Sequence, residues 1–101
     1  MDQLASMRAF VKVVEAGSFV RGADKLGIST TSASRLVAEL EEHLGTRLLQ
    51  RTTRKLHLTD TGQRYLDRAT QLLSDLEEAE NEVGSATTTP RGRLRIFGRK
   101  Q

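Results

Sequence analysis

The chain has 101 residues, a length that suits one small domain with a single hydrophobic core. Lysine and arginine total 16 against 13 acidic residues, and the net charge of +3 with a pI near 9.8 points weakly toward a polyanionic partner. The lack of cysteine excludes disulfides and thiolate metal sites, no apolar run approaches membrane-spanning length, and no secretory signal opens the chain, so we expect a cytoplasmic location.

Three helices, each ended by a glycine, are predicted over residues 3–16, 19–26 and 30–44. In the first, apolar residues recur at three- and four-residue steps, as a helix with one buried face requires. They are Leu4, Met7, Phe10, Val11 and Val14. Asp2 can cap the start of this helix. The glycines that end the three helices are Gly17, Gly27 and Gly45.

Residues 18–35 predict two short helices joined by a tight turn. Ser18 and Ser29 are suited to cap the second and third helices, and Gly27 can adopt the left-handed conformation that ends the second. The apolar face of the second helix is expected to carry Val20, Ala23 and Leu26. The inward stripe of the third is expected to carry Ala33, Leu36, Val37, Leu40 and Leu44. This pattern predicts a helix-turn-helix, and therefore DNA binding.

The start of the third helix is rich in hydroxyl groups, and no acidic residue occurs between Lys25 and Ala38. Small hydroxyl side chains and an arginine suit contacts with base edges and phosphates, and the planar guanidinium of Arg35 can bond in pairs. The candidate DNA-contacting residues here are Ser18, Thr30, Thr31, Ser32, Ser34 and Arg35. The alternative is a solvated helix start, because Ser and Thr favour that position in any helix, and Ser18 can act as a cap alone.

A small two-stranded wing with a basic turn is predicted next, from the apolar pair Leu48-Leu49 and the alternating residues 56–58. Between Gly45 and Lys55 there are four cations and no acid. The candidate contacts with phosphates and the minor groove are Arg51, Thr53, Arg54 and Lys55, with Arg54 expected to be the inserted side chain. An ordinary charged turn is the alternative, and Arg51 can instead pair with a local acid.

A long fourth helix is predicted over 61–83, weakened slightly by Gly62 near its start and ended by Gly84. It spans about 35 Å, more than one small domain covers, so we predict that its apolar seam pairs with a second copy. The candidate dimerisation residues are Tyr65, Leu66, Ala69, Leu72, Leu73, Leu76, Ala79 and Val83. Acidic residues crowd 75–82, so like charges should oppose pairing, and added salt should tighten it.

Together these features resemble the N-terminal DNA-binding region of LysR-type transcriptional regulators, over about residues 2 to 95. The resemblance lies in the Phe10 helix, Gly17-Ser18-Phe19, Ala23 with Leu26, Ser29, Ser34-Arg35, Leu40-Glu41, Leu44-Gly45, Leu48-Leu49, Arg51-Thr52-Thr53-Arg54, and Leu58-Thr59 with Gly62. It implies a mainly α fold, with a winged helix-turn-helix of three helices plus a two-stranded wing over 1–59 and a dimerisation helix over 60–84. Residues 85–101 would be a linker followed by the first strand, over 92–97, of an effector-binding domain that is otherwise absent here, or by a tail unrelated to that domain.

The resemblance implies double-stranded DNA and a second copy of the chain as partners, with a small-molecule effector only for the absent domain, and no membrane. Three positions depart from the family pattern: glutamine is common at the position of Thr30, a larger valine at that of Ala33, and alanine at that of Gly22. The shorter side chain of Thr30 puts any shared half-site preference in doubt. Gly22 is expected to soften the second helix by up to about 1 kcal/mol.

No enzyme, cofactor or metal site is expected. His43 and His57 lie fourteen residues apart without a helical or cysteine partner pattern, so solvated histidines are the better interpretation. No arrangement of nucleophile and base, phosphate-binding loop or paired carboxylates is recognisable. The alternative function is a winged-helix interaction module that dimerises through the fourth helix without binding nucleic acid.

Overall fold

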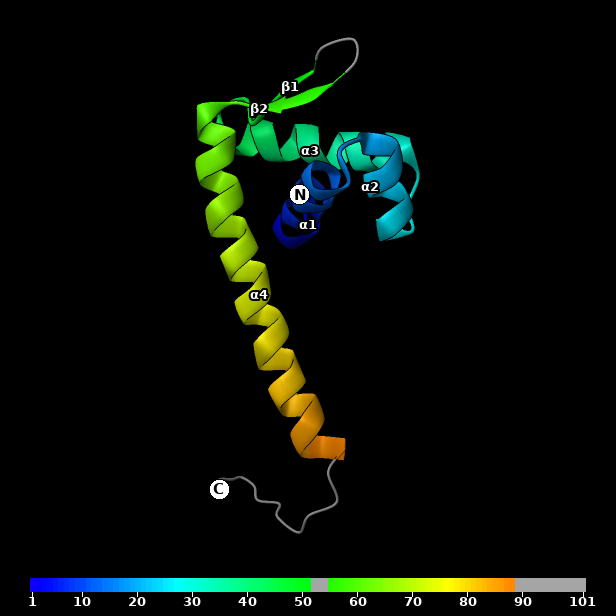
Figure 1. The fold of residues 1–101 in the computed structure, drawn as a ribbon, viewed down its shortest axis with the longest axis vertical. Coiled ribbons are helices and arrows are strands. Elements are labelled where there is room, and N and C mark those ends of the chain that lie inside the picture. The colour runs from blue at the N-terminus through cyan, green and yellow to red at the C-terminus, as the bar shows by residue number, and fades with distance from the viewer. Residues whose placement is uncertain (52–54, 89–101) are drawn as a thin grey trace.

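The computed structural model describes residues 1–51 and 55–88, and in these ranges it has four helices and a two-stranded sheet (Figure 1). In chain order the elements are α1 (Gln3–Ala16), α2 (Phe19–Leu26), α3 (Thr30–Leu44), β1 (Leu49–Arg51), β2 (Leu56–Leu58) and α4 (Asp60–Thr88). The predicted fold class, a winged helix-turn-helix followed by a long helix, is therefore confirmed. The strand predicted over 92–97 lies outside the described residues.

The starts and ends of the first three helices follow from the capping residues in the sequence. Side-chain oxygens of Asp2, Ser18 and Ser29 each accept the backbone N–H three residues further on, at 3.1, 3.1 and 3.0 Å. Gly27 and Gly45 both have a φ of 72°, a left-handed conformation that side chains other than glycine rarely adopt. The turn between α2 and α3 is therefore short and its geometry is fixed.

The core surrounds α1, in which Phe10 and Val13 are wholly buried. The buried cluster consists of Ala9, Phe10, Val11, Val13, Val37, Leu40, Leu48, Leu49 and Ala69. Three residues that we expected on buried faces are exposed instead: Leu4 (42%), Val20 (65%) and Leu44 (37%). Each lies in the first or last turn of its helix. In α2, Phe19, the neighbour of Val20, packs against the core instead.

Gly22 has a packing function that the sequence did not reveal. A Cβ atom at this position would lie 2.7 Å from the Cα and 2.8 Å from the Cγ2 of Val13. Since real Cβ atoms do not approach other carbons so closely, the glycine allows α1 and α2 to pack against each other. Its effect on the molecule is therefore more than a softening of α2.

The wing is joined to α4 by a single residue, Thr59. Strands β1 and β2 are antiparallel, with Leu49 opposite Leu58. The backbone N–H of Thr59 donates to the carbonyl of Leu48 at 3.0 Å, and its hydroxyl oxygen accepts the N–H of Gly62 at 2.9 Å. A Cβ atom at Gly62 would collide with the same Leu48 carbonyl. The first turn of α4 is thus pressed directly onto the start of β1.

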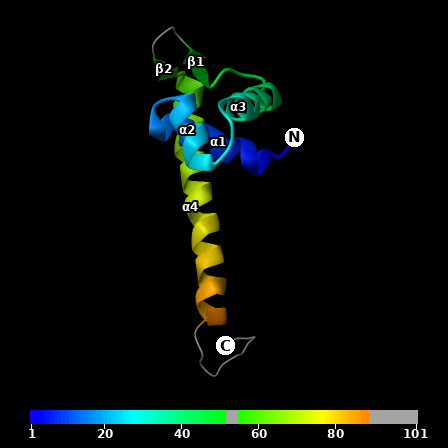
Figure 2. The same ribbon diagram turned by 90° about the vertical axis from the view of Figure 1, so that its right-hand side faces the viewer.

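Helix α4 runs past α1 and then extends away from the rest of the fold, as two perpendicular views show (Figures 1 and 2). Its first half packs against the core through Tyr65, Leu66, Ala69 and Leu73. We expected the whole apolar seam to be too long for the domain to cover. In the structure these four side chains pack against the core cluster of their own chain, so only part of the seam is open.

The prediction that α4 ends at Gly84 was wrong, because the helix continues to Thr88. One glycine in a helix costs about 1 kcal/mol relative to alanine, which is too little to stop an established helix. In the described ranges, none of the helices combines the length and the apolar character that crossing a bilayer would demand.

Candidate nucleic-acid interface

The start of α3 presents part of the predicted DNA-contacting set to solvent. Thr30, Thr31 and Arg35 are exposed, whereas Ser32 and Ser34 are half-buried. The hydroxyl of Ser32 also accepts a hydrogen bond, at 2.9 Å, from the Ser29 cap that begins the helix. The three exposed side chains are therefore the best placed to reach a groove of DNA.

Ser18 acts as the cap of α2. Its half-buried hydroxyl oxygen accepts the backbone N–H of Arg21 at 3.1 Å. A hydroxyl that accepts this bond keeps its own proton, which it can donate to a phosphate oxygen. The capping and phosphate-binding interpretations of this residue are therefore compatible.

The wing adds positive charge near α3. Arg47, Arg51 and Lys55 lie on or beside its strands, while Thr53 and Arg54 fall outside the described residues. Both views place the wing and α3 at the same end of the molecule, opposite the far end of α4 (Figures 1 and 2). The basic residues therefore gather at one end, and the acidic run over 75–82 lies along the other.

The Arg51 side chain contacts two residues of the same chain, Glu41 and Phe19. Its Nη2 atom lies 3.9 Å from the Oε1 atom of Glu41, and its guanidinium carbon lies 4.7 Å from the centre of the Phe19 ring. Pairing with a local acid, which the sequence left open, is therefore present in the fold. The Arg51 side chain remains 35% exposed, so part of it is still available to solvent.

Glu41 is a residue that the sequence reasoning did not assign to the site. It lies in the last turn of α3, where a negative charge is unfavourable because the helix dipole leaves partial negative charge there. Its Oε2 atom accepts the backbone N–H groups of Leu48 and Leu49 at 2.9 and 3.1 Å. The sequence carries no signal that distinguishes it from Glu42, an acid in the same turn that is exposed.

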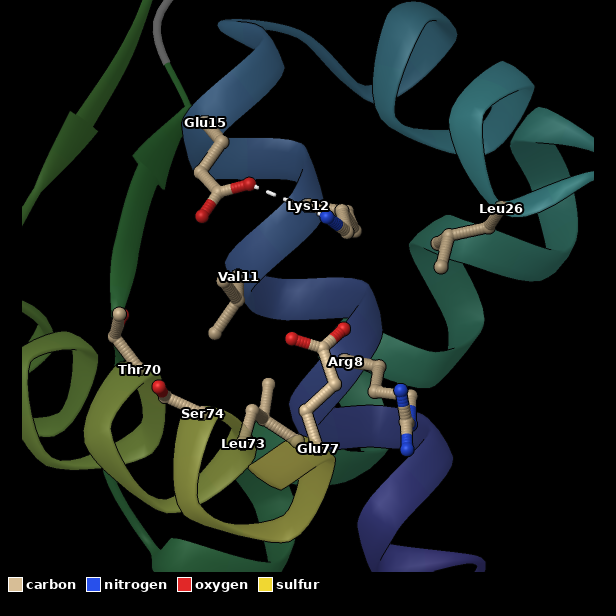
Figure 3. A pocket seen from close by; sticks show the side chains of 9 residues that line it. All are labelled: Arg8, Val11, Lys12, Glu15, Leu26, Thr70, Leu73, Ser74 and Glu77. Atoms are coloured by element: carbon tan, nitrogen blue, oxygen red, sulfur yellow. Dashed lines mark hydrogen bonds and ion pairs between the residues drawn. The ribbon is translucent and has the colours of Figure 1, made fainter. Parts of the chain in front are cut away.

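A concavity of about 220 Å³ lies between α1, the end of α2 and α4 (Figure 3). Arg8 and Lys12 of α1 face it together with the acids Glu15 and Glu77, so the four charges cancel. Lys12 and Glu15 form an exposed ion pair at 3.5 Å. Without net charge this cleft offers little attraction to a phosphate, in contrast to the end formed by α3 and the wing.

The candidate dimerisation residues divide into two sets. Tyr65, Leu66, Ala69 and Leu73 pack against the core of their own chain, as described above. Leu72 and Val83 are 56% and 67% exposed, Ala79 is exposed, and Leu76 is half-buried. An apolar contact with a second copy therefore has to be made by this second set.

Tyr65 joins α4 to α1. Its ring lies 5.7 Å from the Phe10 ring, centroid to centroid, with the planes inclined by 57°. Burial raises the pKa of the Tyr65 hydroxyl, because the phenolate would lose its hydration. The hydroxyl is buried and has no hydrogen-bond partner among the residues that the structure describes.

Metal binding has no support in this geometry. The described residues contain no group of three or more histidine and acidic side chains that could hold an ion. His43 and His57 are both exposed, one on α3 and the other on β2.

Comparison with known proteins shows that this chain is similar in sequence to bacterial transcriptional regulators. Residues 4–63 match the family model described as bacterial regulatory helix-turn-helix protein, lysR family. An HTH-type transcriptional repressor of Pseudomonas aeruginosa is 51% identical over 96 residues, which are 95% of this chain and 30% of that protein. An uncharacterized HTH-type transcriptional regulator of Haemophilus influenzae is 46% identical, also over 95% of this chain and over 33% of that protein.

Solved structures give the same picture. The BenM_DBD/catB site 1 DNA complex matches with a TM-score of 0.80 and 36% identity over 88% of this chain and 99% of that chain. The oxidized form of OxyR from Corynebacterium glutamicum matches with a TM-score of 0.77 and 35% identity over 82% of this chain and 27% of that chain. The chain spans about a quarter to a third of the length of the curated relatives it matches.

Proposed function

This chain belongs to the LysR family of bacterial regulatory helix-turn-helix proteins, and from that membership we propose that it binds double-stranded DNA sequence-specifically. It would do so as the DNA-binding part of a transcriptional regulator, with residues 1–59 as the unit that contacts the duplex. This is a binding function, not a catalytic one, and we propose the cytoplasm as its location.

The observation that carries the proposal is the pairing of an exposed, acid-free helix start with a basic wing at one end of the molecule. In the mechanism that we infer, the start of α3 enters the major groove and reads base edges through Thr30, Thr31 and Arg35. The wing then lies over the flanking minor groove, with Arg54 as the inserted side chain and Lys55 neutralising phosphate charge. The complex of BenM_DBD with DNA, which is similar over nearly its whole chain, supports this inference.

We also propose that two copies pair through the exposed part of α4. Leu72, Ala79 and Val83 are apolar and exposed on a helix that extends beyond its own domain. A two-fold pairing of such helices is self-complementary, and it would set the distance between the two DNA half-sites. The acidic run over 75–82 should make the pairing tighten with added salt.

A salt titration with two arginine variants tests DNA binding. We expect the affinity for duplex DNA to fall with salt, with a log–log slope of about −0.9 for each phosphate neutralised. Arg35→Ala should change the preferred sequence and cost about 1–3 kcal/mol of binding free energy on that site. Arg68→Ala is the matched control, because it removes the same charge from an exposed position on α4.

The alternative is a winged-helix interaction module that dimerises without binding nucleic acid. It predicts no salt-dependent binding to any duplex and the same behaviour of Arg35→Ala and Arg68→Ala. Selection of duplexes from a random pool distinguishes the two functions further, since an interaction module would enrich no sequence.

A further inference from the structure

Glu41 lies where α3 and the wing meet. Its backbone carbonyl accepts the N–H groups of Gly45 and Thr46, at 2.9 and 3.1 Å, as α3 ends. One oxygen of its carboxylate then accepts the N–H groups of Leu48 and Leu49, at 2.9 and 3.1 Å, as β1 begins. Four backbone amides of the connection between α3 and β1 are thus bound by this one residue.

The second carboxylate oxygen of Glu41 extends the connection to α2. It lies 3.9 Å from Arg51, whose guanidinium lies over the ring of Phe19, the first residue of α2. The Glu41 side chain is only 10% exposed, so water screens its interactions less than those of an ion pair on the open surface. Because Arg51 is the last residue of β1, this contact holds the strand at its end as well as at its start.

The charge of Glu41 is unfavourable in its position. It adds a negative charge to the last turn of a helix, whose dipole disfavours it. If the proposed function is right, it also lies in a module that approaches a polyanion, where a carboxylate by charge alone weakens binding. A side chain that opposes both effects, yet makes two backbone hydrogen bonds and an ion pair, points to a geometric function.

We propose that Glu41 is a positioning residue for DNA binding, which fixes β1 and Arg51 against α3 and the start of α2. It would set where the wing lies relative to the helix in the major groove without touching the DNA itself. The inference rests on the proposed function. Its distinctive consequence is that removing this negative charge should weaken binding to DNA.

Glu41→Gln isolates the contact with Arg51. The amide oxygen of the substituted side chain can still accept the N–H groups of Leu48 and Leu49, whereas its NH2 group would face the guanidinium, and two donors cannot bond. We expect affinity for a selected duplex to fall about three- to ten-fold, the size of an ordinary coupling between contacting residues.

The matched control is Glu42→Gln. Glu42 is exposed on the same turn, so this variant removes the same charge one residue away and should bind DNA equally well or more tightly. If Glu41→Gln and Glu42→Gln shift the affinity in the same direction and by the same amount, Glu41 acts only through its charge and the inference is overturned. A parent chain that binds no duplex at all overturns the proposed function, and this inference with it.

Nuclear magnetic resonance tests the contacts without DNA. In the parent, the Arg51 side-chain protons should show upfield ring-current shifts from Phe19, and the amides of Leu48 and Leu49 should exchange slowly. Glu41→Gln should abolish the upfield shifts but keep the slow exchange, and Glu41→Ala should lose both. Upfield shifts that survive in Glu41→Gln would show that Arg51 is held without Glu41, and would overturn the inference even if the variant is less stable.

Arg51→Lys completes the test. Lysine keeps the positive charge but lacks the planar guanidinium that pairs with a carboxylate and stacks on a ring. We expect this variant to weaken DNA binding as Glu41→Gln does, and the two changes together to cost less than the sum of their separate effects. Additive losses would show that the two residues act independently, contrary to the inference.

Discussion

The two ends of α4 have the same kind of sequence but opposite surroundings. Near its start, Gly62 is buried against the carbonyl of Leu48, and Leu66 and Leu73 pack on the core. Near its end, a Cβ atom at Gly84 would meet no described atom within 4 Å, and Val83 is 67% exposed. Glycines and apolar residues at helical spacing therefore identify a helix face without indicating what covers it.

Gly62→Ala tests the buried end and should have the largest effect. Its methyl group would collide with a backbone carbonyl, which cannot rotate away, so either α4 or the wing must shift. We expect the free energy of unfolding to fall by about 3 kcal/mol or more, at the upper end of overpacking costs. Urea denaturation measures it, and a loss below about 1 kcal/mol would show that the junction is looser than described.

Substitutions at the neighbouring residues Leu72 and Leu73 test the exposed face and the core-facing side of α4. Leu73→Asp should reduce the free energy of unfolding by about 2–4 kcal/mol, because it places a carboxylate against the core. Leu72→Asp alters a side chain that is 56% exposed, so the winged helix should remain folded while the dimer dissociates. Its affinity for a duplex with two half-sites should then equal that for one.

Sedimentation velocity and urea denaturation of both aspartate variants measure these outcomes. A parent chain that is monomeric at every salt concentration would contradict pairing through α4. Equal losses of stability in the two variants would contradict the assignment of Leu73 to the core and of Leu72 to the open face.

Tyr65→Phe tests the contact between α4 and α1 and should have a smaller effect. Because the hydroxyl is buried without a partner among the described residues, its removal should leave stability unchanged or raise it by up to about 1 kcal/mol. Burial raises the pKa of Tyr65 above its ordinary value of 10.0. The folded state therefore favours the neutral phenol, and this contribution to stability is complete below pH 10 and is lost as pH rises through the higher, folded-state pKa.

The parent should consequently lose stability above pH 10 more steeply than Tyr65→Phe. Tyr65 is the only tyrosine of the chain, so its titration can be followed by phenolate absorbance without interference. A pKa at or below the ordinary value in the folded protein would contradict the burial of the hydroxyl.

Gly84→Ala tests the open end and should have the smallest effect. With no described atom to collide with, the alanine should raise local helix stability by up to about 1 kcal/mol, the difference in helix propensity. Circular dichroism should show equal or slightly greater helicity, and slower amide exchange after residue 80. A marked loss of stability would mean that the far end of α4 is packed against something.

The sequence was sufficient for the elements, apart from the end of α4, and insufficient for their contacts. Capping serines, glycines with positive φ and apolar periodicity predicted α1, α2 and α3 with their observed bounds, because these signals are local. Gly22 and Gly62 were interpreted only as weak helix formers, since close approach of another element cannot be read from neighbouring residues.

In the candidate site, too, the contacts between elements could not be predicted from the sequence. Thr30, Thr31 and Arg35 were predicted to contact DNA, and they are exposed, as such contacts require. The contacts of Arg51 and Glu41 depend on how β1 returns to α3. An arginine beside a strand has several possible partners in a sequence, and only the fold determines which one it meets. Which of these side chains touch DNA remains a prediction for the variants above.

Because a single residue connects β2 to α4, the orientation of the long helix is coupled to that of the wing. The N–H of Thr59 donates to the carbonyl of Leu48, and Gly62 lies against the same carbonyl, so the joint has little freedom to bend. The 29 residues of α4 extend about 43 Å from this joint, so a rotation of about 10° at the wing corresponds to about 7 Å at the far end. A displacement of that far end would therefore rotate the wing through only a small angle.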